Sequence, residues 1–163
     1  MRKITATLCL TIAVLLGSVG CEESADFQKG YTAYKSGDFA TALRNWTPLA
    51  EQGHATAQYN LGLMYRNGKG VPQNHKTAVK WYRLAAEQGN ADAQGLLGAV
   101  YVLSTGVRKD NSYAYMWLIL AAANGNAEAE EMRDLISQKM TPTEISTAND
   151  RARECVLKKY KGC

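Results

Sequence analysis

Apolar residues recur at helical spacing along most of the chain. Gln58, Leu61, Gly62 and Tyr65 follow the i, i+3, i+4, i+7 spacing of one helical face. Two glycines and a proline at 68–72 then interrupt the pattern. No run rich in β-branched residues, which would favour a strand, appears anywhere. The pattern therefore predicts an all-α chain.

A second helix is predicted to follow at about residues 76–88. Ala78, Trp81 and Ala85 share one face of this helix, which is predicted to be buried. Gly89 comes next, and glycine commonly takes the left-handed position after a helix end. The two helices together form one helix pair.

The sequence pattern of this helix pair repeats 36 residues later, and the two copies align without a gap. The sequence A-T-A-Q at 55–58 meets A-D-A-Q at 91–94. Further matches are Leu61-Gly62 with Leu97-Gly98, Tyr65 with Tyr101, Trp81 with Trp117, and Leu84-Ala85-Ala86 with Leu120-Ala121-Ala122. Self-similarity at such a period indicates a solenoid, in which stacked units bury a continuous core.

The repeated pattern A-x-A-Q-x-x-L-G-x-x-Y, followed by G-V, A-x-x-W-Y and A-A-E-Q-G-N, resembles the Sel1-like repeat. That family is related to the tetratricopeptide repeat and has a longer loop between its helices. Residues 54–89 form a near-consensus copy. Residues 90–125 form a second copy, in which Ser104 replaces the first loop glycine and Leu118 replaces a tyrosine. The resemblance implies a short right-handed α-solenoid of antiparallel helix pairs.

Two flanking segments extend the repeat. Residues 26–53 keep the spacing of a plain tetratricopeptide unit, with a short turn at 37–38. Residues 126–163 begin as a partial further copy and end in a predicted capping helix. The interior of successive second helices is predicted to hold the three tryptophans, Trp46, Trp81 and Trp117.

The predicted capping helix has its own start signal. Thr141 can cap it, Pro142 suits its first position, and Glu144 completes a capping box. The helix is expected to end near Lys159. Its many charged residues suit the polar outer face that a terminal unit of a solenoid needs. A basic surface for anionic lipid headgroups is the alternative interpretation.

Residues 1–20 are typical of an export signal. A basic start at Arg2 and Lys3 precedes an uncharged, largely apolar run that ends in small residues. The run is shorter than the roughly 20 residues that a membrane-spanning helix needs. This segment predicts export of the chain to the periplasm of a bacterium.

Cys21 follows the small residues directly. This placement resembles a bacterial lipobox and implies that a lipid is attached to Cys21 after cleavage. Ordinary cleavage after Gly20 is the alternative. Glu22 follows the cysteine in place of the Asp associated with inner-membrane retention, so we expect an outer-membrane-anchored lipoprotein.

Cys155 and Cys163 are left as an even pair if Cys21 carries a lipid. An even pair in an oxidising compartment favours a disulfide. If Cys21 is free, one thiol is left over. Eight helical residues span about 12 Å, whereas bridged Cα atoms lie within about 7 Å. The bond therefore requires the last helix to end and the tail to turn back, which Gly162 permits.

Composition narrows the possible chemistry. The 163 residues carry a net charge of +4 and two histidines, His54 and His75. Two of the basic residues belong to the leader, so the rest of the chain is too weakly basic to indicate nucleic-acid binding. His54 is predicted at a helix start and His75 in a loop, which is not the ligand pattern of a zinc site. We expect no nucleic-acid partner, no metal and no cofactor.

Motifs of catalysis do not appear in the sequence. It has no nucleophile elbow, no phosphate loop and no His-Glu-x-x-His motif, so we expect no enzyme. The cysteine-rich branch of the Sel1-like family has been linked with penicillin binding or hydrolysis. A cell-wall-active or β-lactam-hydrolysing enzyme is therefore the alternative. That branch has disulfides inside its repeats, whereas this chain has no cysteine between Cys21 and Cys155.

The resemblance also implies where a partner would bind. Tetratricopeptide-like proteins usually recognise partners with the first helix of each pair, on the concave side. We therefore predict a protein–protein interaction scaffold that binds an unidentified protein or peptide there. The candidate binding residues lie at off-signature positions of these helices: Tyr59, Leu63, Arg66, Asn67, Asp92, Val102 and Leu103.

Charge supplies a second candidate feature. The stretch 52–86 holds no acidic residue, and Lys76, Lys80 and Arg83 fall on one helical face. A solvated stripe is the simplest interpretation. An acidic partner, or the anionic surface of a membrane beside a lipid anchor, is the alternative.

Overall fold

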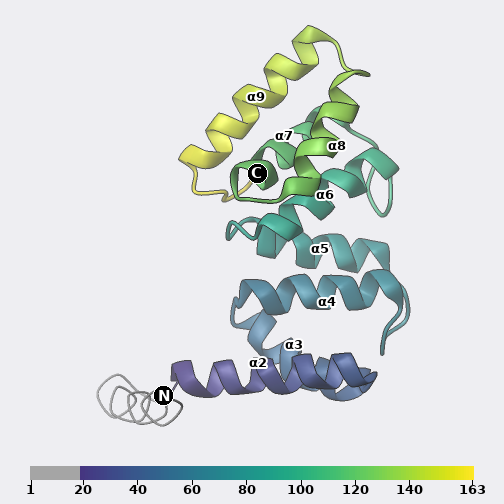
Figure 1. Ribbon diagram of the computed structural model, residues 1–163, viewed down its shortest axis with the longest axis vertical. Coiled ribbons are helices and arrows are strands. Elements are labelled where there is room, and N and C mark those ends of the chain that lie inside the picture. The colour runs from purple at the N-terminus through teal and green to yellow at the C-terminus, as the bar shows by residue number, and fades with distance from the viewer. Residues whose placement is uncertain (1–18) are drawn as a thin grey trace.

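The computed structural model describes residues 19–163, and within them it contains eight helices and no strand. The helices are α2 (Val19–Ser36), α3 (Phe39–Glu51), α4 (Ala55–Asn67), α5 (His75–Ala86), α6 (Ala91–Leu103), α7 (Asn111–Ala123), α8 (Ala127–Ser137) and α9 (Pro142–Leu157). Figure 1 shows them stacked in chain order along the long axis of the molecule. The predicted all-α solenoid is confirmed.

The predicted leader falls almost wholly outside this description. Residues 1–18, which make up most of the predicted signal peptide, lie outside the described residues, as does the side chain of Cys21. None of the helices described is both long enough and apolar enough to cross a membrane.

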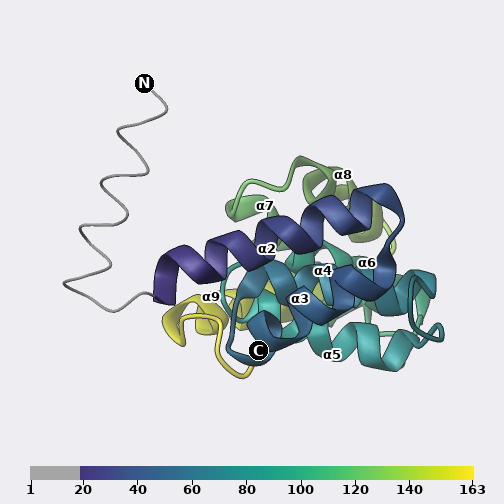
Figure 2. The same cartoon turned by 90° about the horizontal axis from the view of Figure 1, so that it is seen from below.

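Contacts between helices run mainly from neighbour to neighbour. The pairs α2–α3, α4–α5 and α6–α7 pack together, and each second helix then packs on the next first helix. Figure 2, seen from the N-terminal end, shows the first pair, α2 and α3, side by side. This arrangement is the one-dimensional packing of a solenoid.

Helix starts recur with the same period of 36 residues. Each start has a side chain that accepts a hydrogen bond from the backbone N–H three residues further on, which satisfies one donor of the first turn. The capping residues are His54, Asn90 and Asn126 for first helices, and Asp38, Asn74 and Asp110 for second helices. His75, predicted in a loop, is instead the first residue of α5 because Asn74 caps that helix.

The tryptophan prediction needs a correction. Trp81 is only partly buried, and the large aromatic side chain of α5 that is fully buried is its neighbour Tyr82. The capping residues of the second helices are 36 residues apart. By this spacing Trp46 corresponds to Tyr82 rather than to Trp81, and Tyr82 corresponds to Leu118.

Each of these large side chains lies against a glycine of the first helix in its pair. A Cβ atom at Gly30, Gly62 or Gly98 would collide with Trp46, Tyr82 or Leu118, respectively. The glycine therefore lets the two helices approach closely around one large side chain. Gly30 lies closer in sequence to its partner Trp46 than Gly62 and Gly98 lie to theirs, because the α2–α3 turn, residues 37–38, is shorter than the loop 68–74.

Two buried glutamines join consecutive units. Gln58 Nε2 donates to the carbonyl oxygen of Ala50 at 2.9 Å, and Gln94 Nε2 donates to that of Ala86 at 3.0 Å. Their own Oε1 atoms accept from the turn that follows the second helix, Gln88 Nε2 at 2.7 Å and Asn124 Nδ2 at 2.9 Å, respectively. The same hydrogen-bond pattern therefore occurs twice, 36 residues apart.

The last helix departs from the repeat. α9 packs against α7 rather than forming a pair with α8. Its buried residues Ala148, Ala152 and Cys155 follow helical spacing along one face. The predicted capping box is present, since Thr141 accepts from the Glu144 N–H and Glu144 accepts from the Thr141 N–H.

The tail after α9 folds back on the stack. The helix ends at Leu157, two residues before the end predicted, and Cys155 and Cys163 form a disulfide with their Cα atoms 5.5 Å apart. Tyr160, inside this closed loop, donates from its hydroxyl to Asn124 Oδ1 at 3.3 Å. The tail is thereby attached to the same turn that holds Gln94.

Candidate functional site

Two adjoining hollows lie on the first-helix side of the stack. The first hollow, which we call the α4–α6 hollow, has a volume of about 150 Å³. Arg66 of α4 and Leu96, Ala99 and Leu103 of α6 line it, together with side chains of α5 that include Tyr82. Its walls are therefore mostly apolar, with one cationic side chain beside them.

Tyr82 forms part of the wall of the α4–α6 hollow. Its side chain is fully buried, and among the described residues none hydrogen-bonds to its hydroxyl. Burial raises the pKa of Tyr82, and the charge of Arg66 opposes this rise. The hydroxyl therefore stays protonated at neutral pH and is enclosed by the side chains around it.

The second hollow, the α6–α8 hollow, has a volume of about 120 Å³. Its lining includes Tyr59 of α4, Asp92 of α6, and Glu128 and Met132 of α8. Asp92 accepts a hydrogen bond from Asn126 Nδ2 at 3.0 Å, and Glu128 is exposed. This hollow therefore carries negative charge, in contrast to the first.

Leu96 and Ala99 line both hollows and join them. With Asp92 and Leu103 they occupy positions i, i+4, i+7 and i+11 of α6, which form one stripe along a helix. We call the joined hollows the first-helix groove. It runs along α6, with the C-terminal end of α4 beside one end and the N-terminal end of α8 beside the other.

Tyr59 lies between the two charged ends of the groove. Burial raises the pKa of its hydroxyl, the charge of Asp92 adds to this rise, and the charge of Arg66 opposes it. Its ring is also 6.3 Å from the ring of Tyr82, measured between centroids. Tyr59 therefore forms part of the wall between the cationic and the anionic end.

The structure places the sequence-predicted candidates in different settings. The groove is lined by four of them: Tyr59, Arg66, Asp92 and Leu103. Leu63 and Val102 pack partly buried against the core, and Asn67 is exposed, where its Oδ1 accepts from Arg66 Nε at 3.3 Å.

Sequence reasoning did not select several residues that line the groove, among them Leu96 and Met132. Leu96 and Ala99 join the hollows, and Met132 belongs to the α6–α8 hollow. The signal for Leu96 was present, because the first helix of this unit is apolar on nearly every side. Met132 lies past the last clear repeat match, where the family pattern gives no guidance.

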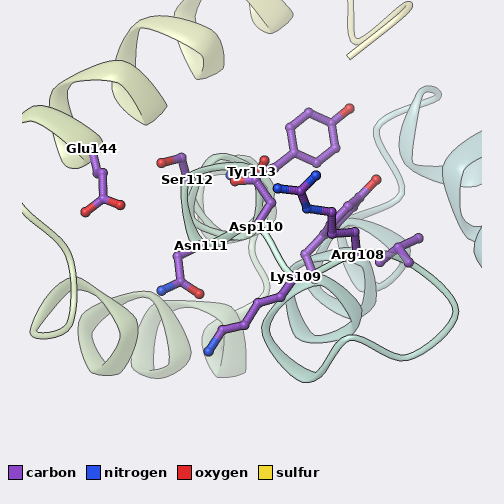
Figure 3. A pocket seen from close by; sticks show the side chains of 9 residues that line it. Arg108, Lys109, Asp110, Asn111, Ser112, Tyr113 and Glu144 are labelled. Atoms are coloured by element: carbon purple, nitrogen blue, oxygen red, sulfur yellow. Dashed lines mark hydrogen bonds between the residues drawn. The ribbon is translucent and has the colours of Figure 1, made fainter.

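A larger, shallow cleft of about 960 Å³ opens between the loop 104–110 and the start of α9. Figure 3 shows Glu144 standing across this cleft from Arg108 and Tyr113. Its carboxylates already serve as helix caps: Asp110 accepts from the Tyr113 N–H at 2.8 Å, and Glu144 forms the capping box of α9. The Thr141 N–H holds the pKa of Glu144 below its ordinary value. These acids are engaged in structure, so we favour the first-helix groove as the site.

The three basic side chains that share one face of α5 have different environments in the structure. Arg83 Nη2 donates to the Tyr101 hydroxyl at 2.7 Å, whereas Lys76 and Lys80 are exposed. Within residues 19–163 no group of three or more His, Cys, Asp or Glu side chains could hold a metal ion.

Comparison with known families and proteins gives the following relatives. The Sel1 repeat family matches residues 55–90 and 91–126. The alginate biosynthesis protein AlgK of Pseudomonas syringae pv. tomato is 34% identical over 83 residues, which are 51% of this chain and 17% of that protein. The DAP3-binding cell death enhancer 1 of Rattus norvegicus is 30% identical over 70 residues, which are 43% of this chain and 12% of that protein.

A solved structure resembles the fold over most of the chain. It is c5321, a protective antigen present in uropathogenic Escherichia coli strains and displaying an SLR fold, with a TM-score of 0.79 and 29% sequence identity. The match covers 85% of this chain and 30% of that one. The chain thus spans less than a fifth of either curated relative and less than a third of this structure.

Proposed function

Because this chain contains two Sel1 repeats, we propose that it is a small helical scaffold that binds a peptide or a partner protein in the first-helix groove. Proteins built from Sel1 repeats generally mediate protein–protein interactions and are generally not enzymes. The observation that carries the proposal is the continuity of two hollows through Leu96 and Ala99, on a helix face that stacking does not consume. Concave, mostly apolar surfaces with a few polar groups are typical of binding sites.

The test of the groove uses two exposed leucines as a matched pair. Leu103 lies in the groove and is 70% exposed, whereas Leu157 lies on α9, outside the groove, and is 84% exposed. A photo-crosslinking amino acid at position 103, in cells that make the protein, is expected to capture a discrete partner. The same group at position 157 is expected not to capture it, and Leu103→Glu is expected to abolish capture by a crosslinker at Ala99.

Equal capture at positions 103 and 157, or capture that survives Leu103→Glu, would place the partner outside the groove. Thermal melting of each variant accompanies the test. Both leucines are exposed, so substitution is expected to leave the melting temperature nearly unchanged.

The same scaffold is proposed to be exported and tethered to the outer membrane by a lipid on Cys21. The basic start, the uncharged run and the small residues before Cys21 support this part of the proposal. Mass spectrometry of the N-terminal peptide from the mature protein is expected to show a diacylated or triacylated cysteine, and Cys21→Ala is expected to release the protein from membrane fractions. An unmodified Cys21 at the mature N-terminus would favour ordinary cleavage instead.

The β-lactam-hydrolysing alternative is not favoured. The repeats of this chain hold none of the cysteines that mark that branch of the family. Incubation of the purified protein with a chromogenic β-lactam is expected to give no turnover. Turnover that survives Leu103→Glu but is lost on substitution of a serine or glutamate would overturn the scaffold proposal.

A further inference from the structure

The two ends of the first-helix groove carry opposite charge. Arg66 lies at the α4–α6 end, and Asp92 and Glu128 lie at the α6–α8 end. Between them the groove is apolar, with Leu96 and Ala99 at its centre. Such a surface is complementary to a partner that presents the reverse order of charges around an apolar centre.

The charges at the two ends are not neutralised by ion pairs within the described part of the chain. Arg66 makes one side-chain hydrogen bond, to the neutral amide of Asn67, and Asp92 accepts from the neutral amide of Asn126. The ion pairs of residues 19–163 involve other side chains, on α2, α8 and α9. The electrostatic potential at each end is therefore available to a partner.

Arg66 supplies the positive charge at the α4–α6 end of the groove. A guanidinium hydrogen-bonds most strongly to a negatively charged oxygen acceptor, so this end favours an acidic group.

The dimensions fit a short peptide segment. Asp92 and Leu103 mark the two ends of the groove on α6, and eleven residues of helix separate them by about 16 Å. An extended segment of about five residues spans that distance. The opposite charges at the ends also disfavour a surface of uniform charge, such as an anionic membrane.

We propose that the first-helix groove binds a peptide segment of charge order acid–apolar–base, with its acidic residue at Arg66, its apolar side chain at Leu96 and Ala99, and its basic residue at Asp92 and Glu128. This inference rests on the proposed binding function and names the chemistry of the partner. It assigns the segment a single orientation, because reversing the segment brings like charges together at both ends.

The test starts from a phage-displayed library of random dodecapeptides, selected against the purified chain without its leader. Selected peptides are expected to share an acidic and a basic residue on either side of an apolar one. Binding is then measured by fluorescence anisotropy with synthetic peptides. Leu103→Glu is expected to weaken binding at least tenfold, which shows that a peptide uses the groove.

Charge reversal then tests the order of charges. The variant Arg66→Glu with Glu128→Lys is expected to bind the selected peptide at least tenfold more weakly, and to prefer a peptide whose acid and base have been exchanged. The matched control is Glu51→Lys with Lys80→Glu, which likewise reverses one basic and one acidic side chain, at exposed positions outside the groove, and is expected to keep the original affinity.

The outcomes separate this inference from the proposed function. Peptides that depend on Leu103 but bind the charge-reversed variant unchanged overturn the charge order and leave the groove as a binding site. Failure to select any peptide that depends on Leu103 overturns both. Preference of the charge-reversed variant for the exchanged peptide supports both.

Discussion

The residue that ends each first helix adopts the left-handed conformation in both Sel1-like copies. Gly68 has φ of 67° at the end of α4, and Ser104 has φ of 59° at the end of α6. Glycine takes this conformation without strain, whereas a side chain with a Cβ atom does so at a cost. The third unit therefore carries local strain at a position where the second carries none.

Ser104→Gly is accordingly expected to raise the free energy of unfolding by about 0.5–1 kcal/mol. Relief of the left-handed strain exceeds the extra freedom that glycine gives the unfolded chain. Urea denaturation followed by circular dichroism measures the change. Gly68→Ser is the matched control and is expected to shift stability by a similar amount in the opposite direction. A stability loss in Ser104→Gly would contradict this account.

The start of α9 depends on one exposed carboxylate. Glu144 accepts a hydrogen bond from the Thr141 N–H at 2.7 Å, and this bond holds its pKa below the ordinary value of 4.5. A carboxylate whose pKa falls on folding stabilises the folded state above its unfolded pKa. That contribution is lost as the pH falls through its folded pKa.

Glu144→Gln is therefore expected to melt at a lower temperature than the parent chain at neutral pH. The difference in melting temperature is expected to shrink as the pH falls below 4.5, because the parent chain then loses the same charge. Melting curves followed by circular dichroism across this range measure it. A difference that stays constant with pH would mean that the charge of Glu144 is not what stabilises the start of α9.

The tail after α9 is held by its disulfide and by Tyr160. Cys163→Ser is expected to lower the free energy of unfolding by about 2 kcal/mol, since a short closed loop restricts the unfolded chain. Tyr160→Phe, which removes only the hydroxyl bond to Asn124, is expected to cost about 1 kcal/mol or less. Denaturation with and without a reducing agent measures the first effect. Equal stability under both conditions, or two free thiols in non-reducing mass spectrometry, would contradict the bond.

Sequence periodicity predicts well which segments are helical, and it predicts less well which side chains are buried. The helix pairs follow from the 36-residue period because apolar spacing and loop glycines recur together. The interior position of the second unit was wrong by one residue, since aromatic identity suggested Trp81 as the counterpart of Trp46, whereas Tyr82 is the buried side chain. The capping residues Asp38 and Asn74 carried the correct phase, because a cap fixes where a helix begins.

The candidate site was predictable in part for a related reason. Exposed faces of first helices can be read from the repeat, and Arg66, Asp92 and Leu103 were found in that way. The joining of hollows at Leu96 and Ala99 depends on how three helices lie beside one another, and a period within single helices does not contain that information. The unpartnered Tyr82 hydroxyl likewise follows only from three-dimensional packing.

For the whole molecule, cohesion between units depends on polar as well as apolar contact. Gln94 carries a hydrogen bond from the third unit to the Ala86 carbonyl of the second, and it is fully buried. Each unit of a solenoid touches mainly its neighbours, so interfaces between units set how cooperatively the stack unfolds. The equivalent position one period later is Glu130, which is exposed.

Gln94→Ala is expected to lower the free energy of unfolding by about 1–3 kcal/mol, because it leaves a buried carbonyl without its donor. The urea transition is also expected to broaden, since the C-terminal units then unfold more independently. Glu130→Ala is the control and is expected to change stability by less than about 0.5 kcal/mol. A single, equally steep transition in Gln94→Ala would show that apolar packing alone couples the units.

The hydrogen bond from a buried glutamine to the preceding unit occurs at both interfaces between units. The surface on which the second unit packs is therefore equivalent to the surface on which the third unit packs. A duplicated copy of residues 55–90, inserted after Asn90, would place its own Gln58 against an Ala86 carbonyl, as Gln94 already lies. Length can therefore grow in steps of 36 residues while α2 and α9 remain as they are. Each step would lengthen the first-helix side of the stack by one unit, and under the proposed binding function it would lengthen the partner segment that this side can contact.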